Sequence, residues 1–210
     1  MSQLLELHPK NPQVRLVRQA VAAMRAGGVI VYPTDSCYAL GCAIGDKGAM
    51  ERIARIRQTD KHHLFTLVCR DLSEIARYAR VENWQYRLLK AATPGPYTFI
   101  LEATREVPRR LLNPKRRAIG IRIPDHPVPL LLLAELGAPL MSSTLSLPGD
   151  KYPLTNAGEI YARLKHEVAA VLDGGNCGLT PTTVVDLTGG APVIVRLGKG
   201  DPARLGATAA

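Results

Sequence analysis

The chain has 210 residues, of which 46% are hydrophobic and only 5% aromatic, so it is long enough to bury a core of mainly aliphatic side chains. Its formal net charge of +9 favours anionic partners such as nucleotides, phosphates or nucleic acids, although a basic protein with no nucleic-acid role has the same balance. Its four cysteines lack C-x-x-C spacing and a matching histidine pair, and no apolar stretch reaches signal-peptide or membrane-span length, so we expect a cytoplasmic protein with no metal site and no membrane contact.

The first half of the chain alternates predicted strands and helices. Asn11 followed by Pro12 predicts the cap and first position of a helix, which Gly27 and Gly28 end. The other elements expected here are a short edge strand over residues 4–7, a buried strand over 29–32, an apolar run over 39–44, a helix over 49–57, a strand over 64–69, and helices beginning at 71 and at 82.

The second half continues the same alternation and ends in a hairpin. The expected elements are strands over 97–101, 119–123, 140–147 and 169–172, helices over 128–136 and 157–166, and a hairpin of 183–187 with 193–196 that turns through Gly189 and Gly190. Residues from about 201 to 210 read as a loose tail. Because strands and helices mingle throughout, we predict a single α/β domain over residues 1–210.

Two polar groups in the first third of the chain carry candidate chemistry. The turn with Thr34, Asp35, Ser36 and Tyr38 lies between two buried runs, where polar residues either line a pocket or cap a helix. Arg55 and Arg57, with Lys61 after them, lie at the end of a predicted helix. They could converge on one anion if the chain turns there, or form a solvated helix end that favours cations.

Two further groups lie in the middle of the chain. Arg122 is flanked by two isoleucines at a strand end and needs a partner if it points inward. Four hydroxyl residues within 142–146 either line a phosphate or carboxylate site or form an ordinary polar loop. Arginine and hydroxyl groups without a clear catalytic base suit phosphate chemistry, in which positioning and charge stabilisation dominate.

Seven motifs in chain order resemble those of the YrdC/YciO family, most closely its single-domain YciO-type branch. For example, Pro33–Gly41 resembles P-T-[ED]-T/S-x-Y-G-L-G, and Arg55-x-Arg57 with Lys61 resembles K-x-R-P-x-x-K. The other five segments are Pro94–Thr98, Arg122–Pro127, Pro139–Gly149, Thr182–Asp186 and Val195–Gly198. The resemblance covers nearly the whole chain and implies a twisted mixed β-sheet flanked by helices, with a basic concave groove of the YrdC/RibB-like kind.

The resemblance also implies a reaction and a set of ligands. The family joins threonine, bicarbonate and ATP into threonylcarbamoyl-adenylate and releases pyrophosphate, for the threonylcarbamoyl modification of adenosine 37 in tRNA. Mg²⁺ would offset the charge of the triphosphate. Carried over by motif, the threonine-binding residues are Thr34, Tyr38, Thr66 and Arg122, and the ATP-binding residues are Arg55, Arg57, Lys61, Thr144, Ser146 and Arg196.

The chain departs from the family pattern at several of these positions. Arg55 stands for the motif lysine, Gln58 for the following proline, Ser146 for an asparagine and Ala39 for a glycine. The sequence therefore leaves three functions open: a threonylcarbamoyl-AMP synthase-like nucleotidyltransferase, a double-stranded RNA-binding protein of the same fold with weak or no synthase activity, and a related ATP-dependent enzyme acting on another amino acid or carboxylate.

A basic segment, residues 105–117, is the candidate surface for double-stranded RNA or tRNA. Pro108 and Pro114 prevent a long helix, so its cations should be exposed and able to meet phosphates. The RNA-binding candidates are Arg109, Arg110, Lys115, Arg116 and Arg117. A basic loop that only improves solubility is the alternative reading.

Overall fold

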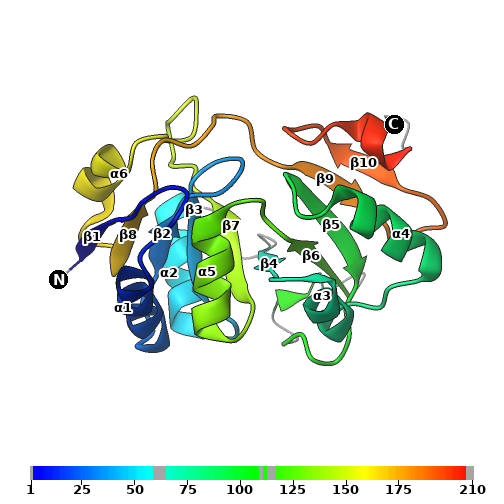
Figure 1. Cartoon of the computed structure of the whole chain (residues 1–210), viewed down its shortest axis with the longest axis horizontal. Coiled ribbons are helices and arrows are strands. Elements are labelled where there is room, and N and C mark those ends of the chain that lie inside the picture. The colour runs from blue at the N-terminus through cyan, green and yellow to red at the C-terminus, as the bar shows by residue number, and fades with distance from the viewer. Residues whose placement is uncertain (1, 59–64, 109–110, 113–116, 207–210) are drawn as a thin grey trace.

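The protein is one α/β domain built on a single mixed sheet (Figure 1), as predicted. The computed structural model describes residues 2–58, 65–108, 111–112 and 117–206. Within these residues, ten strands lie in the order β1-β8-β2-β3-β7-β4-β6-β5-β9-β10, with six α-helices and a short 3-10 helix around them.

The elements follow the predicted order along the chain. The strands are β1 (Gln3–Glu6), β2 (Ile30–Tyr32), β3 (Ala39–Ala43), β4 (Thr66–Val68), β5 (Tyr97–Glu102), β6 (Ala118–Arg122), β7 (Leu140–Thr144), β8 (Ala170–Asp173), β9 (Thr183–Asp186) and β10 (Val193–Arg196). The helices are α1 (Val14–Arg25), α2 (Lys47–Arg57), α3 (Leu72–Tyr78), α4 (Asn83–Ala92), α5 (Pro127–Leu136), α6 (Ala157–Leu164) and the 3-10 helix η2 (Pro202–Leu205).

The sheet mixes parallel and antiparallel pairs. The pairs β2–β3, β3–β7 and β7–β4 are antiparallel, whereas β4 pairs parallel with β6 and β5 pairs parallel with β9. Strand β8 inserts between β1 and β2 and is parallel to both. The predicted hairpin of β9 and β10 is confirmed by their antiparallel pairing.

The centre of one face of the sheet carries an unbroken row of apolar side chains. Cross-strand partners share a face, and the in-register residues Cys42, Met141, Leu67, Ile121, Phe99 and Val185 are all fully buried. They belong to the core cluster that also contains the apolar residues of α2, α3, α4 and α6. A second cluster on the opposite face joins α1 and α5 to β2, β8 and the ends of β4 and β7.

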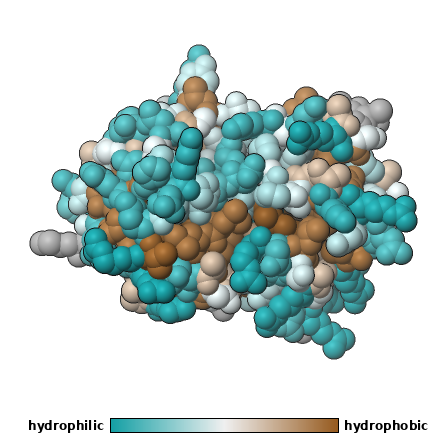
Figure 2. All heavy atoms as spheres, viewed as in Figure 1, coloured by the Kyte–Doolittle hydropathy of each residue, from teal (hydrophilic) through white to brown (hydrophobic). Residues whose placement is uncertain are grey.

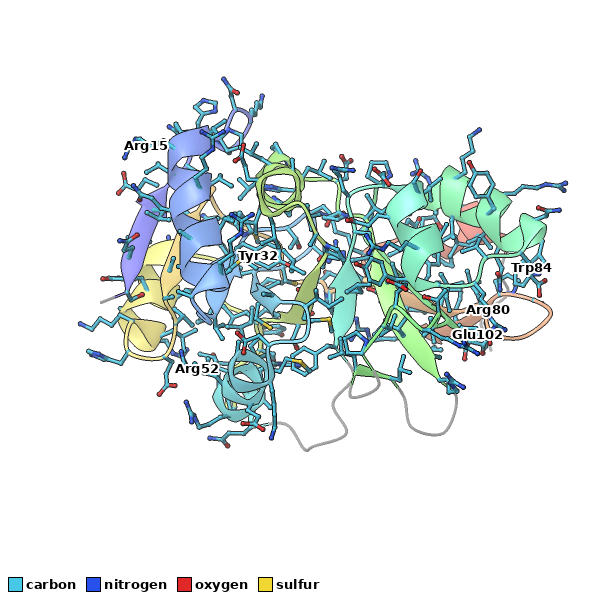
Figure 3. All side chains as sticks on the ribbon, turned by 90° about the horizontal axis from the view of Figure 1, so that it is seen from below. Arg15, Tyr32, Arg52, Arg80, Trp84 and Glu102 are labelled. Carbon is cyan, nitrogen blue, oxygen red and sulfur yellow. The ribbon has the colours of Figure 1, made fainter. Side chains whose placement is uncertain are left out.

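The sheet twists strongly, as long sheets of L-residues do. Figure 3 shows Arg15 of α1 and Arg52 of α2 on opposite sides of the sheet at one end, while α3 and α4 lie on the α1 side at the other end. Because α2, α3 and α4 pack into one cluster, the face that they cover turns from one side of the molecule to the other along the sheet.

Two local predictions at the chain's ends were wrong. Helix α1 begins at Val14 with Gln13 as its cap and no side-chain capping bond, so Asn11 and Pro12 lie outside it. The tail is not loose throughout, because η2 forms over Pro202–Leu205 with an Asp201 cap, and Leu205 is buried. Residues 207–210 lie outside the described residues.

The exposed faces of the elements in view are mostly hydrophilic, with a band of apolar residues across the middle (Figure 2). Helix α5 carries four consecutive leucines, two of which, Leu132 and Leu133, are buried against the α1 side of the core. In the part of the chain that the structure describes, no helix combines the length and the apolar character needed to cross a membrane.

Candidate functional site

A cavity of about 660 Å³ opens on the face of the sheet that α1 and α5 only partly cover. Its floor is the row of residues that comes one position along each strand from the apolar row of the core, and that row therefore points to the opposite face of the sheet. The in-register residues Ser142, Thr66, Gly120, Ile100 and Asp186 run across β7, β4, β6, β5 and β9, and all five line the cavity. Four of these five residues are small or polar, whereas the opposite face carries mainly large apolar residues, and this difference leaves the space open.

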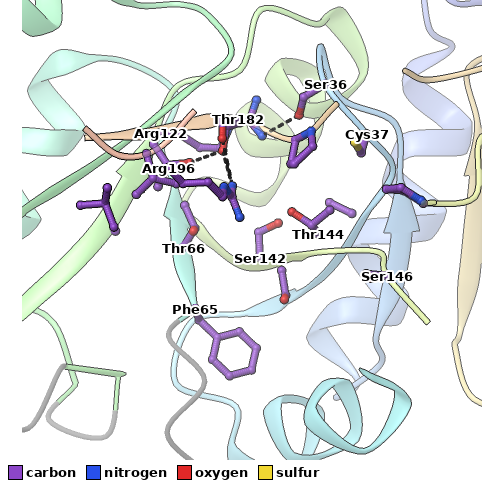
Figure 4. A pocket seen from close by; sticks show the side chains of 18 of the residues that line it. Ser36, Cys37, Phe65, Thr66, Arg122, Ser142, Thr144, Ser146, Thr182 and Arg196 are labelled. Atoms are coloured by element: carbon purple, nitrogen blue, oxygen red, sulfur yellow. Dashed lines mark hydrogen bonds between the residues drawn. The ribbon is translucent and has the colours of Figure 1, made fainter. Parts of the chain in front are cut away.

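Hydroxyl groups surround this floor from several strands (Figure 4). Thr98 Oγ1 and Thr182 Oγ1 form a hydrogen bond of 2.8 Å. Tyr32 fixes Ser142 through a hydrogen bond, because its hydroxyl lies 2.6 Å from Ser142 Oγ. Burial raises the pKa of Tyr32 to about 12, so this phenol stays neutral.

Arg122 enters the cavity from the end of β6 and forms a buried ion pair. Its Nη2 donates to Asp35 Oδ1, both side chains are 9% exposed, and Nη1 lies 3.4 Å from Ser36 Oγ. The buried Nε has no hydrogen-bond partner in the described structure. A buried guanidinium with a spare donor is suited to an anionic or oxygen-bearing ligand, because an unsatisfied buried donor carries a desolvation cost.

Arg57 and Arg196 reach the same cavity from opposite parts of the fold. Arg57 is the last residue of α2 and the only α-helical residue among the described lining residues, and its Nη1 donates to Ser143 Oγ. Arg196 of β10 donates to the Thr182 carbonyl oxygen at 2.9 Å. The pKa of Arg57 is held below its ordinary value, first by burial and then by the positive charge of Arg196. An anion between the two would relieve that repulsion.

The turn of residues 33–38 serves partly as scaffold. Thr34 is buried and does not line the cavity; its hydroxyl donates to the Cys37 carbonyl oxygen at 2.6 Å and accepts from the Ser36 N–H at 3.1 Å. Tyr38 is also buried outside the lining, and its hydroxyl donates to the Gly175 carbonyl oxygen at 2.7 Å. The turn presents Ser36 and Cys37 to the cavity instead.

Cys37 is not arranged as a nucleophile, even though it lines the cavity. Burial raises the pKa of its thiol above the ordinary value, which outweighs the nearby charges of Arg122, Lys199 and Arg196. A thiol in this state is mostly protonated at neutral pH and reacts poorly. Cys37 therefore contributes to the cavity as a lining residue and not as a nucleophile.

Of the predicted ligand residues, the structure brings six to the cavity and separates three from it. Those that line it are Thr66, Arg122, Arg57, Thr144, Ser146 and Arg196. Thr34 and Tyr38 lie behind the turn, and Arg55 is exposed on α2, where its Nη2 lies 3.5 Å from Glu167 Oε2. The geometry therefore does not support Arg55 as an ATP ligand.

The remaining predicted residues fall largely outside the described residues. Lys61 is one of these, as are Arg109, Arg110, Lys115 and Arg116 of the basic segment. Arg117 is described and is exposed, with a positive φ of 49°.

The sequence alone did not reveal several lining residues. Thr98, Ile100 and Asp186 line the cavity because strand register brings β5 and β9 to it, and periodicity within one strand does not give that register. Lys151 and Tyr152 join from the connection between β7 and α6, where no local pattern marked them.

Comparison with known proteins places the chain in a family. Residues 22–198 match the Sua5/YciO/YrdC family model, which is described as "Telomere recombination". The chain belongs to the Sua5/YciO/YrdC family. The resemblance inferred from the seven motifs is thereby confirmed.

Within the Sua5/YciO/YrdC family, the chain is very similar to YciO of Escherichia coli. The two sequences are 56% identical over 201 residues, which cover 96% of this chain and 98% of YciO. The crystal structure of E. coli YciO superposes with a TM-score of 0.93 and covers 98% of this chain and 100% of that one. That relative is named only as an uncharacterized protein, so the likeness assigns no reaction.

More distant members of the family carry the name of an activity. The threonylcarbamoyl-AMP synthase of Chromohalobacter salexigens is 31% identical over 176 residues, covering 83% of this chain and 94% of the synthase. Sua5 of P. abyssi, solved with L-threonine, is 23% identical with a TM-score of 0.84, and the match covers 94% of this chain and 57% of Sua5. The second likeness shows the shared fold.

Proposed function

We propose that the protein is an ATP-dependent nucleotidyltransferase that makes threonylcarbamoyl-AMP from threonine, bicarbonate and ATP and releases pyrophosphate. The observation that carries the proposal is the convergence of Arg57, Arg122 and Arg196 on one hydroxyl-lined cavity of about 660 Å³. All three substrates contain anionic groups, and a cavity of this volume lies within the range of small-molecule sites.

The triphosphate would lie between Arg57 and Arg196. These guanidinium groups repel each other across the cavity, so a polyanion gains from both at once. Guanidinium groups bind phosphate oxygens through paired, charge-assisted hydrogen bonds. As pyrophosphate leaves, the same two groups would stabilise the negative charge that develops on it.

The carboxylate of threonine would lie at Arg122. The buried pair with Asp35 fixes the orientation of the guanidinium group and neutralises its charge, and the spare Nε donor remains for the ligand. Hydroxyl groups of Thr66 and Ser36 lie in the same lining and offer donors and acceptors to the polar groups of threonine.

The described lining fits Mg²⁺ only as an ion brought by ATP. Asp186 is the one carboxylate in that lining, and its Oδ1 already accepts from Thr188 N and Oγ1 at 2.8 and 2.6 Å. Mg²⁺ is commonly held by one or two carboxylates together with substrate phosphates and water. The ion would offset phosphate charge while Arg57 and Arg196 orient the chain of phosphates.

Two departures from the family motifs shape this cavity. Arg55 does not line the cavity but pairs with Glu167, so it adds no charge to the part of the cavity where the triphosphate would lie. Gln58 caps α2 with a φ of 47°, a conformation closed to the motif proline because proline fixes φ near −65°. Gln58 therefore ends the helix in a backbone conformation that the motif proline could not adopt.

The test measures pyrophosphate release with ATP, threonine and bicarbonate, and with each omitted in turn. The proposal expects release only when all three are present, because the carbamate forms from threonine and bicarbonate before it attacks the α-phosphate. Release without threonine, or stimulated instead by another amino acid or carboxylate, would assign a different acceptor. No release under any of these conditions would refute the proposed reaction.

Binding of double-stranded RNA or tRNA by residues 105–117 is a separate proposal. Its support is the basic composition of the segment and the exposure of Arg105 and Arg117 at its described ends. Duplex-RNA affinity that falls steeply with salt, in the absence of pyrophosphate release, would favour this function over the synthase.

A further inference from the structure

A tyrosine behind the cavity reaches a serine that lines it. Tyr32 of β2 is fully buried in the core cluster that contains apolar residues of α1 and α5, and it is not among the described lining residues. Ser142 of β7 lies on the floor of the cavity beside Thr66 (Figure 4), and the hydroxyl oxygens of Tyr32 and Ser142 are 2.6 Å apart. A buried residue outside the cavity is therefore bonded to a hydroxyl group inside it.

The tyrosine ring reaches Ser142 by crossing the strand between them. Strand β3 lies between β2 and β7, and its Gly41 is in register with Ser142. A Cβ atom at Gly41 would lie only 2.8 Å from Cε1 of Tyr32, which is closer than Cβ atoms approach their neighbours in folded proteins. The glycine therefore leaves the space through which the ring passes, and a side chain at position 41 would displace the Tyr32 hydroxyl from Ser142.

The hydrogen bond between the two hydroxyl groups satisfies both of them in only one direction. Each hydroxyl group has one proton to donate. Among the described residues, Ser142 Oγ is the only hydrogen-bond partner of the Tyr32 hydroxyl. If Ser142 donated, the Tyr32 proton would be buried without an acceptor and would carry the full desolvation cost of an unpaired donor. Tyr32 therefore donates to Ser142, and the Ser142 proton is left for the cavity.

The position of Ser142 on the floor indicates what its proton meets. Its in-register neighbour Thr66 lies beside β6, the strand that ends at Arg122. The next residue in the chain is Ser143, whose Oγ accepts from Nη1 of Arg57. Ser142 thus lies between the guanidinium group proposed for the threonine carboxylate and one proposed for the phosphates. A proton directed into this space needs an acceptor there, which a carboxylate-type oxygen supplies and an ammonium group does not.

We propose that Tyr32 is a positioning residue, which donates to Ser142 Oγ and thereby directs the Ser142 proton to a carboxylate-type oxygen of the substrate. Ser142 is then the residue that touches the substrate, and Tyr32 acts through it. The inference rests on the proposed function for its choice of substrate. The oxygen belongs either to the carboxylate of threonine or to bicarbonate and the carbamate formed from it, and the experiment distinguishes these two sources.

The first experiment measures pyrophosphate release by Tyr32→Phe, which removes the hydroxyl and keeps the ring. The Ser142 hydroxyl is then free to turn, so kcat/KM should fall about tenfold while the dissociation constant of ATP changes by less than about twofold. A fall for bicarbonate assigns the oxygen to the carbamate, and a fall for threonine alone assigns it to the threonine carboxylate. Tyr97→Phe is the matched control, because Tyr97 is 2% exposed, donates to the Asp201 carbonyl oxygen at 3.0 Å and does not line the cavity.

A double-mutant cycle shows whether Tyr32 acts through Ser142. Ser142→Ala should lower kcat/KM at least as much as Tyr32→Phe, and the double variant should be no worse than Ser142→Ala alone. A tyrosine with a merely structural role would instead add its loss to that of Ser142→Ala. Additive losses, or a Tyr32→Phe variant that behaves like Tyr97→Phe, would overturn the proposal.

Binding measurements separate this inference from the proposed function. If the unmodified protein releases no pyrophosphate, the proposed reaction fails, and the same cycle is measured on the binding of threonine and of bicarbonate by calorimetry. Weaker binding in Tyr32→Phe that disappears in the Ser142→Ala background would keep the positioning role. Normal binding in Tyr32→Phe, or no binding of either ligand to the unmodified protein, would refute that role. Release by the unmodified protein together with additive losses in the cycle would keep the reaction and refute only the positioning role.

Discussion

Replacing Arg57 by alanine should weaken ATP binding while leaving the fold intact. Arg57 is the last residue of α2, outside the buried face formed by Ala49, Met50, Ile53 and Ile56. Its guanidinium group lies in the cavity, where the pKa is lowered by burial and by Arg196, so the folded protein holds this charge at a disadvantage. Loss of its bond to Ser143 Oγ should change the free energy of unfolding by only about 1 kcal/mol.

The effect on ligand affinity should be larger. A charge-assisted contact to phosphate contributes about 1.5–3 kcal/mol, so the dissociation constant of ATP should rise roughly 10- to 150-fold. Calorimetric titration with ATP and urea unfolding measure the two quantities. Arg55→Ala on the same helix is the control, because Arg55 pairs with Glu167 at the surface and should change neither by much. A large loss of stability with unchanged ATP affinity would make Arg57 a structural residue and refute this reasoning.

Three further predictions concern the buried ion pair, acid sensitivity and RNA. Asp35→Ala leaves Arg122 as an uncompensated buried charge and should reduce the free energy of unfolding by about 3–5 kcal/mol in urea titrations; a loss below about 1 kcal/mol would show that the pair is not stabilising. His126 caps α5 by accepting from Val128 N, and burial lowers the pKa of its imidazole. As the pH drops below about 6.5, the unfolded chain therefore binds a proton at His126 before the folded protein does, and the free energy of unfolding should fall. His126→Asn keeps a capping acceptor and should flatten that slope between pH 7 and 5, and an unchanged slope would assign it to other groups. Reversing the charges of Arg109, Arg110, Arg116 and Arg117 should abolish duplex-RNA binding and its salt dependence while ATP binding survives, and unchanged RNA affinity would remove the segment from the interface.

Much of the fold could be predicted from the sequence because its local signals agree with its packing. The capping side chain of Asp71 begins α3, and the left-handed cap at Gly137 ends α5. Such signals act over a few residues and can be read directly. The start of α1 was mispredicted because the backbone of Pro12 is compatible both with the residues before a helix and with the first turn of a helix.

The site was predicted less completely, because it depends on strand register and side-chain direction. Arg55 and Arg57 are indistinguishable as cations in the sequence, yet one pairs with Glu167 and the other enters the cavity. Thr34 belongs to the motif turn, but its hydroxyl is used by the turn's own backbone. These outcomes follow from the orientation of each side chain in the folded protein, which spacing alone does not determine.

The position of β8 between β1 and β2 determines when this part of the sheet can form during synthesis of the chain. Gln3 of β1 and Ile30 of β2 both pair with Ala170, so the start of the chain must wait for its partner until most of the chain has been synthesised. Until then, β1 and one side of β2 remain as open strand edges, which are sites of aggregation, and contacts this distant in sequence form slowly. A chain that terminates before Ala170 therefore loses the partner of its first strand as well as its C-terminal hairpin, and chaperones would meet it with its N-terminal sheet edge exposed.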